Sequence, residues 1–122
     1  MRVTNRADKS LGEVVPGVRR AIYFDAPEGS TQLSLGAAEI DPGKEIPIHR
    51  HRVGDRFVEE GFFVIDGDGE VRIGERTSPL HPGSFCVMSP AEGFHSILNT
   101  GTKTLRFVMC FAGTDVQMER KT

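Results

Sequence analysis

The sequence has few of the residues that indicate disulfide bonding, membrane insertion or nucleic-acid binding. It contains no tryptophan, one tyrosine and two cysteines among 122 residues. No apolar run approaches the roughly 20 residues of a membrane span, and the first residues lack the apolar core of a signal peptide. Fifteen basic and seventeen acidic residues are interspersed along the chain, whereas binding to a phosphate backbone needs clustered basic residues. We therefore expect a cytoplasmic protein with neither a membrane nor a nucleic acid as partner.

The length and the cysteines favour a single domain without disulfides. A chain of 122 residues suits one hydrophobic core, so residues 1–122 are expected to form one domain, with residues 1–12 as an arm and residues 114–122 as a polar tail. Cys86 and Cys110 lie in apolar segments and lack the spacing of a metal or redox pair. We expect both to be buried free thiols.

Short apolar runs, separated by glycine and proline at intervals of roughly ten residues, indicate an all-β fold. Long helical periodicity is absent. The segment Gly67-Asp68-Gly69 between two apolar runs is expected to be a hairpin turn. The expected strands are residues 19–25, 32–40, 46–52, 60–66, 70–74, 84–88, 95–99 and 104–111.

Three of the four histidines and one glutamate form a candidate metal-binding set. His49 and His51 are two residues apart, so in a strand their side chains point to the same face. Glu60 and His95 each begin an apolar run, and a carboxylate is costly to bury there unless it is paired or bound to metal. Three imidazoles with one carboxylate suit Fe, Mn, Ni, Co or Zn better than Ca or Mg.

The spacing of these residues resembles the two motifs of the cupin superfamily. In the first, five residues separate Gly43 from His49-Arg50-His51, and six separate Glu60 from Gly67. The second contains Gly83, Pro90, His95 and Asn99, with three residues between the last two. The resemblance implies a cupin double-stranded β-helix, a mostly antiparallel jelly-roll barrel. It also implies one divalent transition metal ion on His49, His51, Glu60 and His95.

The sequence departs from the first motif between its histidines and its glutamate. Eight residues separate His51 from Glu60, where the family has three or four. The extra residues, 53–57, are expected in a loop at the mouth of the barrel. Asp55 and Glu59 are therefore rival ligands. We prefer Glu60, because alternation along the strand places it on the inner face together with Phe62 and Val64.

Other side chains have weaker expectations attached to them. His81 is expected in a surface turn, and Arg106 is expected to point outward rather than into a cavity. Six apolar residues are expected in the core, or less strongly in the lining of a pocket: Phe62, Val64, Phe85, Ile97, Phe107 and Met109.

Two classes of function are compatible with such a site. A metal with four protein ligands keeps about two open positions. It could serve a metal-dependent enzyme, a dioxygenase, isomerase or lyase, acting on a small polar, oxygen-rich metabolite. The alternative is a non-catalytic module that binds or senses a small molecule and has a structural metal. We favour the enzyme, because a sensor usually carries a DNA-binding domain. The N-terminal arm and first strand leave an exposed edge, so a homodimer is expected.

Overall fold

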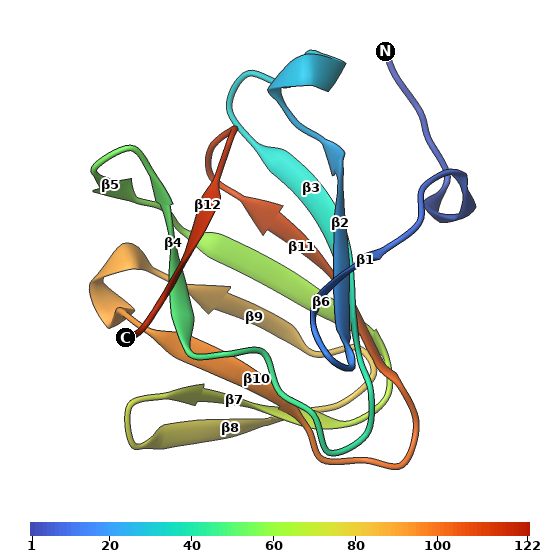
Figure 1. The fold of residues 1–122 in the computed structure, drawn as a ribbon, viewed down its shortest axis with the longest axis vertical. Helices are drawn as coiled ribbons and strands as arrows, with labels where there is room; N and C mark the ends of the chain where they lie inside the picture. Colours follow the sequence, from blue (N-terminus) through green and yellow to red (C-terminus); the bar gives the residue numbers. More distant parts are fainter.

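The computed structural model describes all residues, 1–122, and places them in two antiparallel sheets packed face to face (Figure 1). Sheet I has the order β1 (Gly12–Val15), β2 (Val18–Phe24), β3 (Ser34–Ile40), β11 (Leu105–Phe111), β6 (Glu60–Asp66) and β9 (Phe85–Met88). Sheet II has the order β12 (Gln117–Arg120), β4 (His49–Val53), β10 (His95–Asn99), β7 (Gly69–Ile73) and β8 (Arg76–Leu80), and β5 (Arg56–Phe57) pairs with β4. The helices are three short 3-10 turns, η1 (Arg6–Asp8), η2 (Ala26–Glu28) and η3 (Pro90–Glu92). None of them has the length and hydrophobicity that crossing a bilayer requires.

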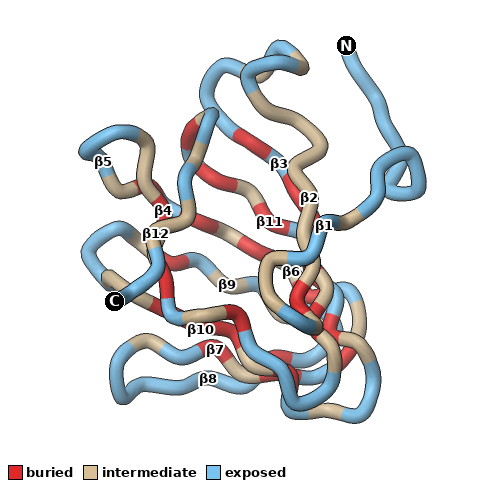
Figure 2. The backbone as a smooth tube through the Cα atoms, viewed as in Figure 1, coloured by how far each residue is buried: buried red, intermediate tan, exposed pale blue.

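The core lies between the inner faces of the two sheets, where the buried stretches of Figure 2 meet. Alternation along β6 creates this arrangement, since Glu60, Phe62 and Val64 are buried while Ile65 points outward and is 50% exposed. The register expected for this strand is therefore confirmed. The jelly-roll barrel expected from the resemblance is confirmed as well.

Four strands, β1, β5, β8 and β12, were not expected from the sequence, and β5 lies in the segment expected to be a loop. β8 has the sequence RTSPL, in which a single leucine is buried, and a proline is tolerated there because β8 is an edge strand. β12 falls in the segment expected to be a polar tail, yet it pairs with β4 over four residues. In both strands backbone pairing forms with little apolar alternation, which is the signal that sequence reasoning depends on.

The segment Gly67-Asp68-Gly69 is not the expected hairpin turn. β6 belongs to sheet I and β7 to sheet II, so the strands on either side do not pair with each other. The segment is a corner between the sheets, and it packs closely against the start of β11. A Cβ on Gly67 would lie 2.7 Å from the carbonyl oxygen of Thr104, and one on Gly69 would lie 2.6 Å from that of Leu98.

The expectation that Phe85 is in the core is wrong. Phe85 is 83% exposed, because it pairs with the outward-facing Phe63 across β6 and β9. Cys86 and Cys110 are free thiols, as expected, but both are half-buried rather than buried. Burial raises the pKa of Cys86 to about 11 and also raises that of Cys110, so both remain thiols at neutral pH.

The corner gives a test of the fold that does not involve the candidate metal-binding residues. Gly67 and Gly43 both have positive φ, +85° and +76°, so alanine strains the backbone at either position. Only at Gly67 would the new Cβ meet backbone atoms, because nothing lies within 4 Å at Gly43. We expect Gly67→Ala to reduce the free energy of unfolding by about 1–3 kcal/mol more than Gly43→Ala does. Urea unfolding followed by circular dichroism measures this difference, and equal losses would show that the corner adapts.

Candidate metal centre

The four expected side chains come together in the barrel interior from both sheets. His49 and His51 lie on the inner face of β4, and His95 is paired directly with His49 from the neighbouring strand β10. Glu60 faces them from the first residue of β6 in the opposite sheet. All four residues are buried, and one ligand atom from each lies within 4.8 Å of all the others. They could therefore hold a metal ion.

The distances between the ligand atoms fit a shared ion better than a network of hydrogen bonds. Glu60 Oε1 lies 3.1 Å from His51 Nε2 and 3.2 Å from His95 Nε2, and His49 Nε2 is 3.1 Å from His51 Nε2. Ligands at right angles around an ion about 2.1–2.2 Å away are about 3.0–3.1 Å apart. Although they are this close, Glu60 Oε1 and His95 Nε2 have no hydrogen-bond partner. Buried polar atoms of this kind require another partner, and a metal ion would be one.

Pro47 fixes the orientation and the tautomer of His49. His49 Nδ1 lies 2.6 Å from the Pro47 carbonyl oxygen, which can only accept, so Nδ1 carries the proton that it donates. The lone pair is then on Nε2, the atom directed at the cluster. Burial, together with the nearby His95 and His51, lowers the pKa of His49 to about 3. His49 is therefore neutral at physiological pH, as metal binding requires.

Glu60 is ionised despite being buried. Burial by itself raises the pKa of the carboxyl group, but contacts with His51 and His95 lower it by more, so the pKa falls to about 2. His49 and Glu60 therefore bring one neutral imidazole and one negative charge to the cluster. This donor set suits a divalent transition metal.

The rival ligands lie away from the cluster. Residues 49–57 form a small hairpin in which β5 pairs with β4, and Asp55 is exposed at its tip. Glu59 is also exposed. His81 is in an exposed turn, with its Nδ1 3.0 Å from Asp68 Oδ1. Arg106 points outward, with its Nε 3.1 Å from Glu39 Oε2. His81 and Arg106 therefore lie as expected, and neither Asp55 nor Glu59 is among the four clustered residues.

Two hollows flank the cluster, each with room for about one water-sized group. The larger one, of about 20 Å³, is lined by His49, His51 and Glu60 together with Arg20 from β2. The smaller one, of about 10 Å³, lies beside His95, Glu60 and Arg50. Sequence reasoning missed Arg20. Its position between Val18 and Ile22, two residues away on either side, is the signal that could have placed it on the inner face.

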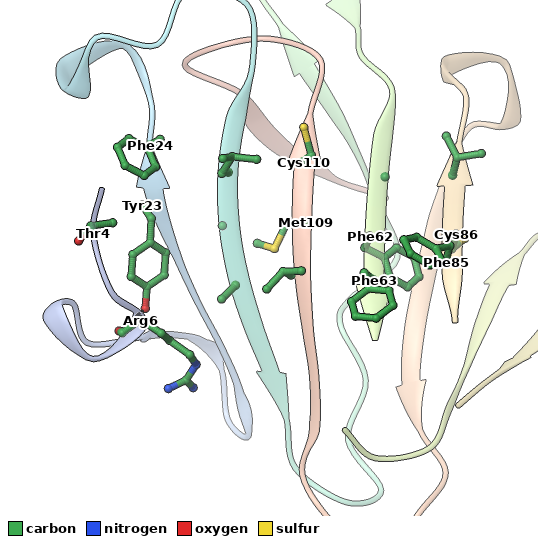
Figure 3. Close-up of a pocket in the computed structure, with 16 residues that line it drawn as sticks. Thr4, Arg6, Tyr23, Phe24, Phe62, Phe63, Phe85, Cys86, Met109 and Cys110 are labelled. Carbon is green, nitrogen blue, oxygen red and sulfur yellow. Dashed lines mark hydrogen bonds between the residues drawn. The ribbon is translucent and has the colours of Figure 1, made fainter. Parts of the chain in front are cut away.

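A much larger hollow lies outside the barrel, between the outer face of sheet I and the N-terminal arm (Figure 3). Its volume is about 680 Å³, and most of the residues that line it are apolar. Tyr23 connects the arm to the sheet by donating a hydrogen bond to the carbonyl oxygen of Arg6 at 2.6 Å. None of the four clustered residues lines this hollow, so the chemistry of the site belongs to the interior.

Comparison with known proteins agrees with the fold. Residues 36–111 match the family described as Cupin domain. This is more than half of the chain, and it includes both histidine strands and Glu60. The protein therefore belongs to the cupin family. A comparison with curated proteins found no match.

Solved structures with a similar fold have different roles. The polyketide cyclase RemF from Streptomyces resistomycificus is 20% identical with a TM-score of 0.79, covering 100% of this chain and 86% of its own. KdgF from Halomonas sp. is 19% identical with a TM-score of 0.72, covering 91% and 93%. The Cupin_2 domain of an XRE family transcriptional regulator from Enterobacter cloacae is 18% identical with a TM-score of 0.64, covering 78% and 95%. At these identities the likeness concerns the fold alone.

The choice of Glu60 over Asp55 predicts how metal affinity responds to substitution. We expect Glu60→Gln to weaken metal binding by an order of magnitude or more, because the site loses its only negative charge. The matched change Asp55→Asn, at the exposed hairpin tip, should leave affinity unchanged. Competition with a chromophoric chelator measures both, and the opposite ranking would place the ligand in the hairpin.

Proposed function

We propose that the protein binds one divalent transition metal ion through His49, His51, Glu60 and His95 and acts as a metal-dependent enzyme on a small oxygen-rich metabolite. The observation that carries this proposal is the convergence of three imidazole nitrogens and one carboxylate oxygen in the interior, with Glu60 Oε1 and His95 Nε2 left without hydrogen-bond partners. Fe, Mn, Ni, Co and Zn are the ions that this donor set suits.

A bound ion would supply Lewis acidity and, if it were iron, the capacity to activate O₂. The protein contributes the charge balance, because three neutral imidazoles and one carboxylate leave a divalent ion with a net charge of about +1. It also contributes a dry surrounding surface, since Ile97, Phe107 and Phe111 are each at most 2% exposed. An excess positive charge in such surroundings favours a ligand that is anionic or rich in oxygen. Dioxygenase, isomerase and lyase reactions all use ligands of this kind.

The two small hollows support an enzyme over a purely structural metal site. Structural sites have a closed coordination sphere, whereas catalytic sites keep a position for water or substrate. Both hollows border the cluster and have room for about one water molecule each. The similarity to the polyketide cyclase RemF also supports an enzyme, whereas the similarity to a domain of a transcriptional regulator supports the binding module.

An open coordination position can be measured directly. We expect the Mn²⁺-loaded protein to increase the longitudinal relaxation rate of water protons above that of metal-free protein, because a metal-bound water would exchange with the solvent. Protein that takes up stoichiometric Mn²⁺ without this increase would have a closed site, and the metal would then be structural. Dialysis before the measurement removes unbound Mn²⁺, and the dialysed Glu60→Gln variant is the control for ion bound elsewhere.

We also propose that the protein is a homodimer that forms through the outer face of sheet I. This face carries exposed apolar residues that include Leu35, Phe85, Val87 and Val108, and its hollow is shown in Figure 3. The outer face of sheet II differs, because it carries charged pairs such as Arg50–Glu119 and Arg72–Glu70. Monomeric proteins rarely expose apolar patches of more than a few hundred Å².

The size of this face fits a two-fold contact with a second copy. The five strands that line the hollow are β2, β3, β11, β6 and β9. At about 4.8 Å apart and about six residues long, they cover roughly 500 Å², without the added area of their side chains. The arm adds to this area. The sum is of the order of the roughly 800 Å² per partner that stable complexes bury.

The dimer can be tested with one substitution on each outer face. We expect wild-type protein to have the mass of a dimer in light scattering at micromolar concentration. Phe85→Asp should convert it to monomer, because a charge would be buried in the contact. Thr77→Asp, on the exposed strand β8 of sheet II, should remain dimeric. A monomeric wild-type protein would contradict the proposal.

A further inference from the structure

Arg20 is the one arginine that extends from the inner face of sheet I toward the candidate metal centre. It belongs to a row of directly paired residues that crosses four strands of sheet I. The row consists of Arg20 on β2, Ala38 on β3, Phe107 on β11 and Val64 on β6. Directly paired residues share a face of the sheet, and the other three members of this row are buried in the core. Arg20 itself is half-buried. Its side chain therefore runs along the interior of the barrel.

The Arg20 guanidinium has no partner in the protein. The adjacent Arg19 illustrates the usual arrangement, with an ion pair to Asp41 at 2.8 Å and a second contact with Glu39 at 3.5 Å. The Arg20 side chain forms neither a hydrogen bond nor an ion pair with any residue. Burial lowers the pKa of Arg20, and the more distant charge of Glu60 is the only influence that raises it.

The charges around the larger hollow are unbalanced. Arg20, His49, His51 and Glu60 all border it, and most of its remaining lining is apolar. Glu60 is the only carboxylate that borders the hollow, and Arg19, which also borders it, is paired with Asp41. A divalent ion would bring the net charge facing the hollow to about +2 when Arg20 is included. Unpaired positive charge in apolar surroundings is unfavourable unless an anion accompanies it.

We propose that Arg20 determines ligand specificity by forming a two-point ion pair with the carboxylate of a small organic acid whose remaining oxygen atoms face the histidine cluster. The planar guanidinium presents parallel N–H donors that match the two oxygens of a carboxylate. The hollow has a volume of about 20 Å³, so a bound acid would have to enlarge it, and a carboxylate group requires less enlargement than a bulkier tetrahedral phosphate. This inference rests on the proposed function, since it places the small molecule beside the proposed metal ion.

Malonate binding to the Mn²⁺-loaded protein tests the role of Arg20. Isothermal titration calorimetry should show that Arg20→Met weakens malonate binding roughly 10- to 100-fold, as expected for the loss of a charge-assisted hydrogen-bonded pair. Arg20→Lys should have an intermediate malonate affinity, because lysine keeps the positive charge but lacks the parallel N–H donors of the guanidinium. Arg106→Met removes an arginine from the outer face of the same sheet and should leave malonate affinity unchanged. Phosphate that binds more tightly than malonate would overturn the carboxylate assignment.

A second measurement distinguishes ligand recognition from a structural role. Without malonate, the melting temperature of Arg20→Met should equal or exceed that of wild type, because an unpaired, half-buried charge has been replaced by an apolar side chain. Malonate should raise the melting temperature of wild type but not of Arg20→Met. Unchanged malonate affinity in Arg20→Met, with a lower melting temperature in its absence, would overturn the inference.

The same variants separate failure of this inference from failure of the proposed function. Arg20→Met should take up as much Mn²⁺ as wild type, since Arg20 is not among the four clustered residues. If wild-type protein takes up no metal, the proposed function fails. The malonate-induced shift in melting temperature, measured on metal-free wild type and Arg20→Met, then tests Arg20 alone. Equal shifts in the two proteins would reject its role.

Discussion

The central constraint on this protein is that three imidazoles and a carboxylate are buried at one point of an otherwise apolar barrel. Burying such groups is costly unless each polar atom has a partner, and Glu60 Oε1 and His95 Nε2 have none within the protein. The surrounding structure is arranged to keep them in place. Pro47 orients His49, the pairing of His95 with His49 joins two strands of sheet II, and the register of β6 directs Glu60 inward.

Much of the fold and of the site could be predicted from local patterns in the sequence. Two-residue spacing put His49 and His51 on one face, and apolar alternation set the register that makes Glu60, rather than Glu59, the inward residue. The failures concern information that local patterns do not contain. β12 forms because β4 has a free edge with which it can pair. The corner at Gly67 depends on β7 joining sheet II rather than sheet I. Phe85 lies in a strand that is apolar on both faces, so the sequence does not show which face is buried. Arg20 was missed because Arg19 beside it is also charged and β2 shows no regular alternation of buried and exposed residues.

The two sheets differ in what their outer faces can do. Sheet II is solvated through charged pairs on β4, β7 and β12, whereas sheet I has aromatic and aliphatic side chains around a hollow. A salt-bridge cluster around Glu39, formed by Arg6, Arg19 and Arg106, borders the apolar surface of sheet I. Apolar surface at the centre and charge at the border is the usual anatomy of a protein interface.

The pairing of β4 has a consequence for the order of folding. Its register joins His49 to His95, and joins His51 to Met118, across long stretches of chain. Closing such long loops is slow compared with forming local turns. The three imidazoles can therefore converge only once β4 and β10 are both present and paired, so an emerging chain that lacks β10 does not yet contain the third histidine. An ion held by all four residues would bind after β4, β6 and β10 have come together, so it would stabilise the folded barrel rather than nucleate its folding.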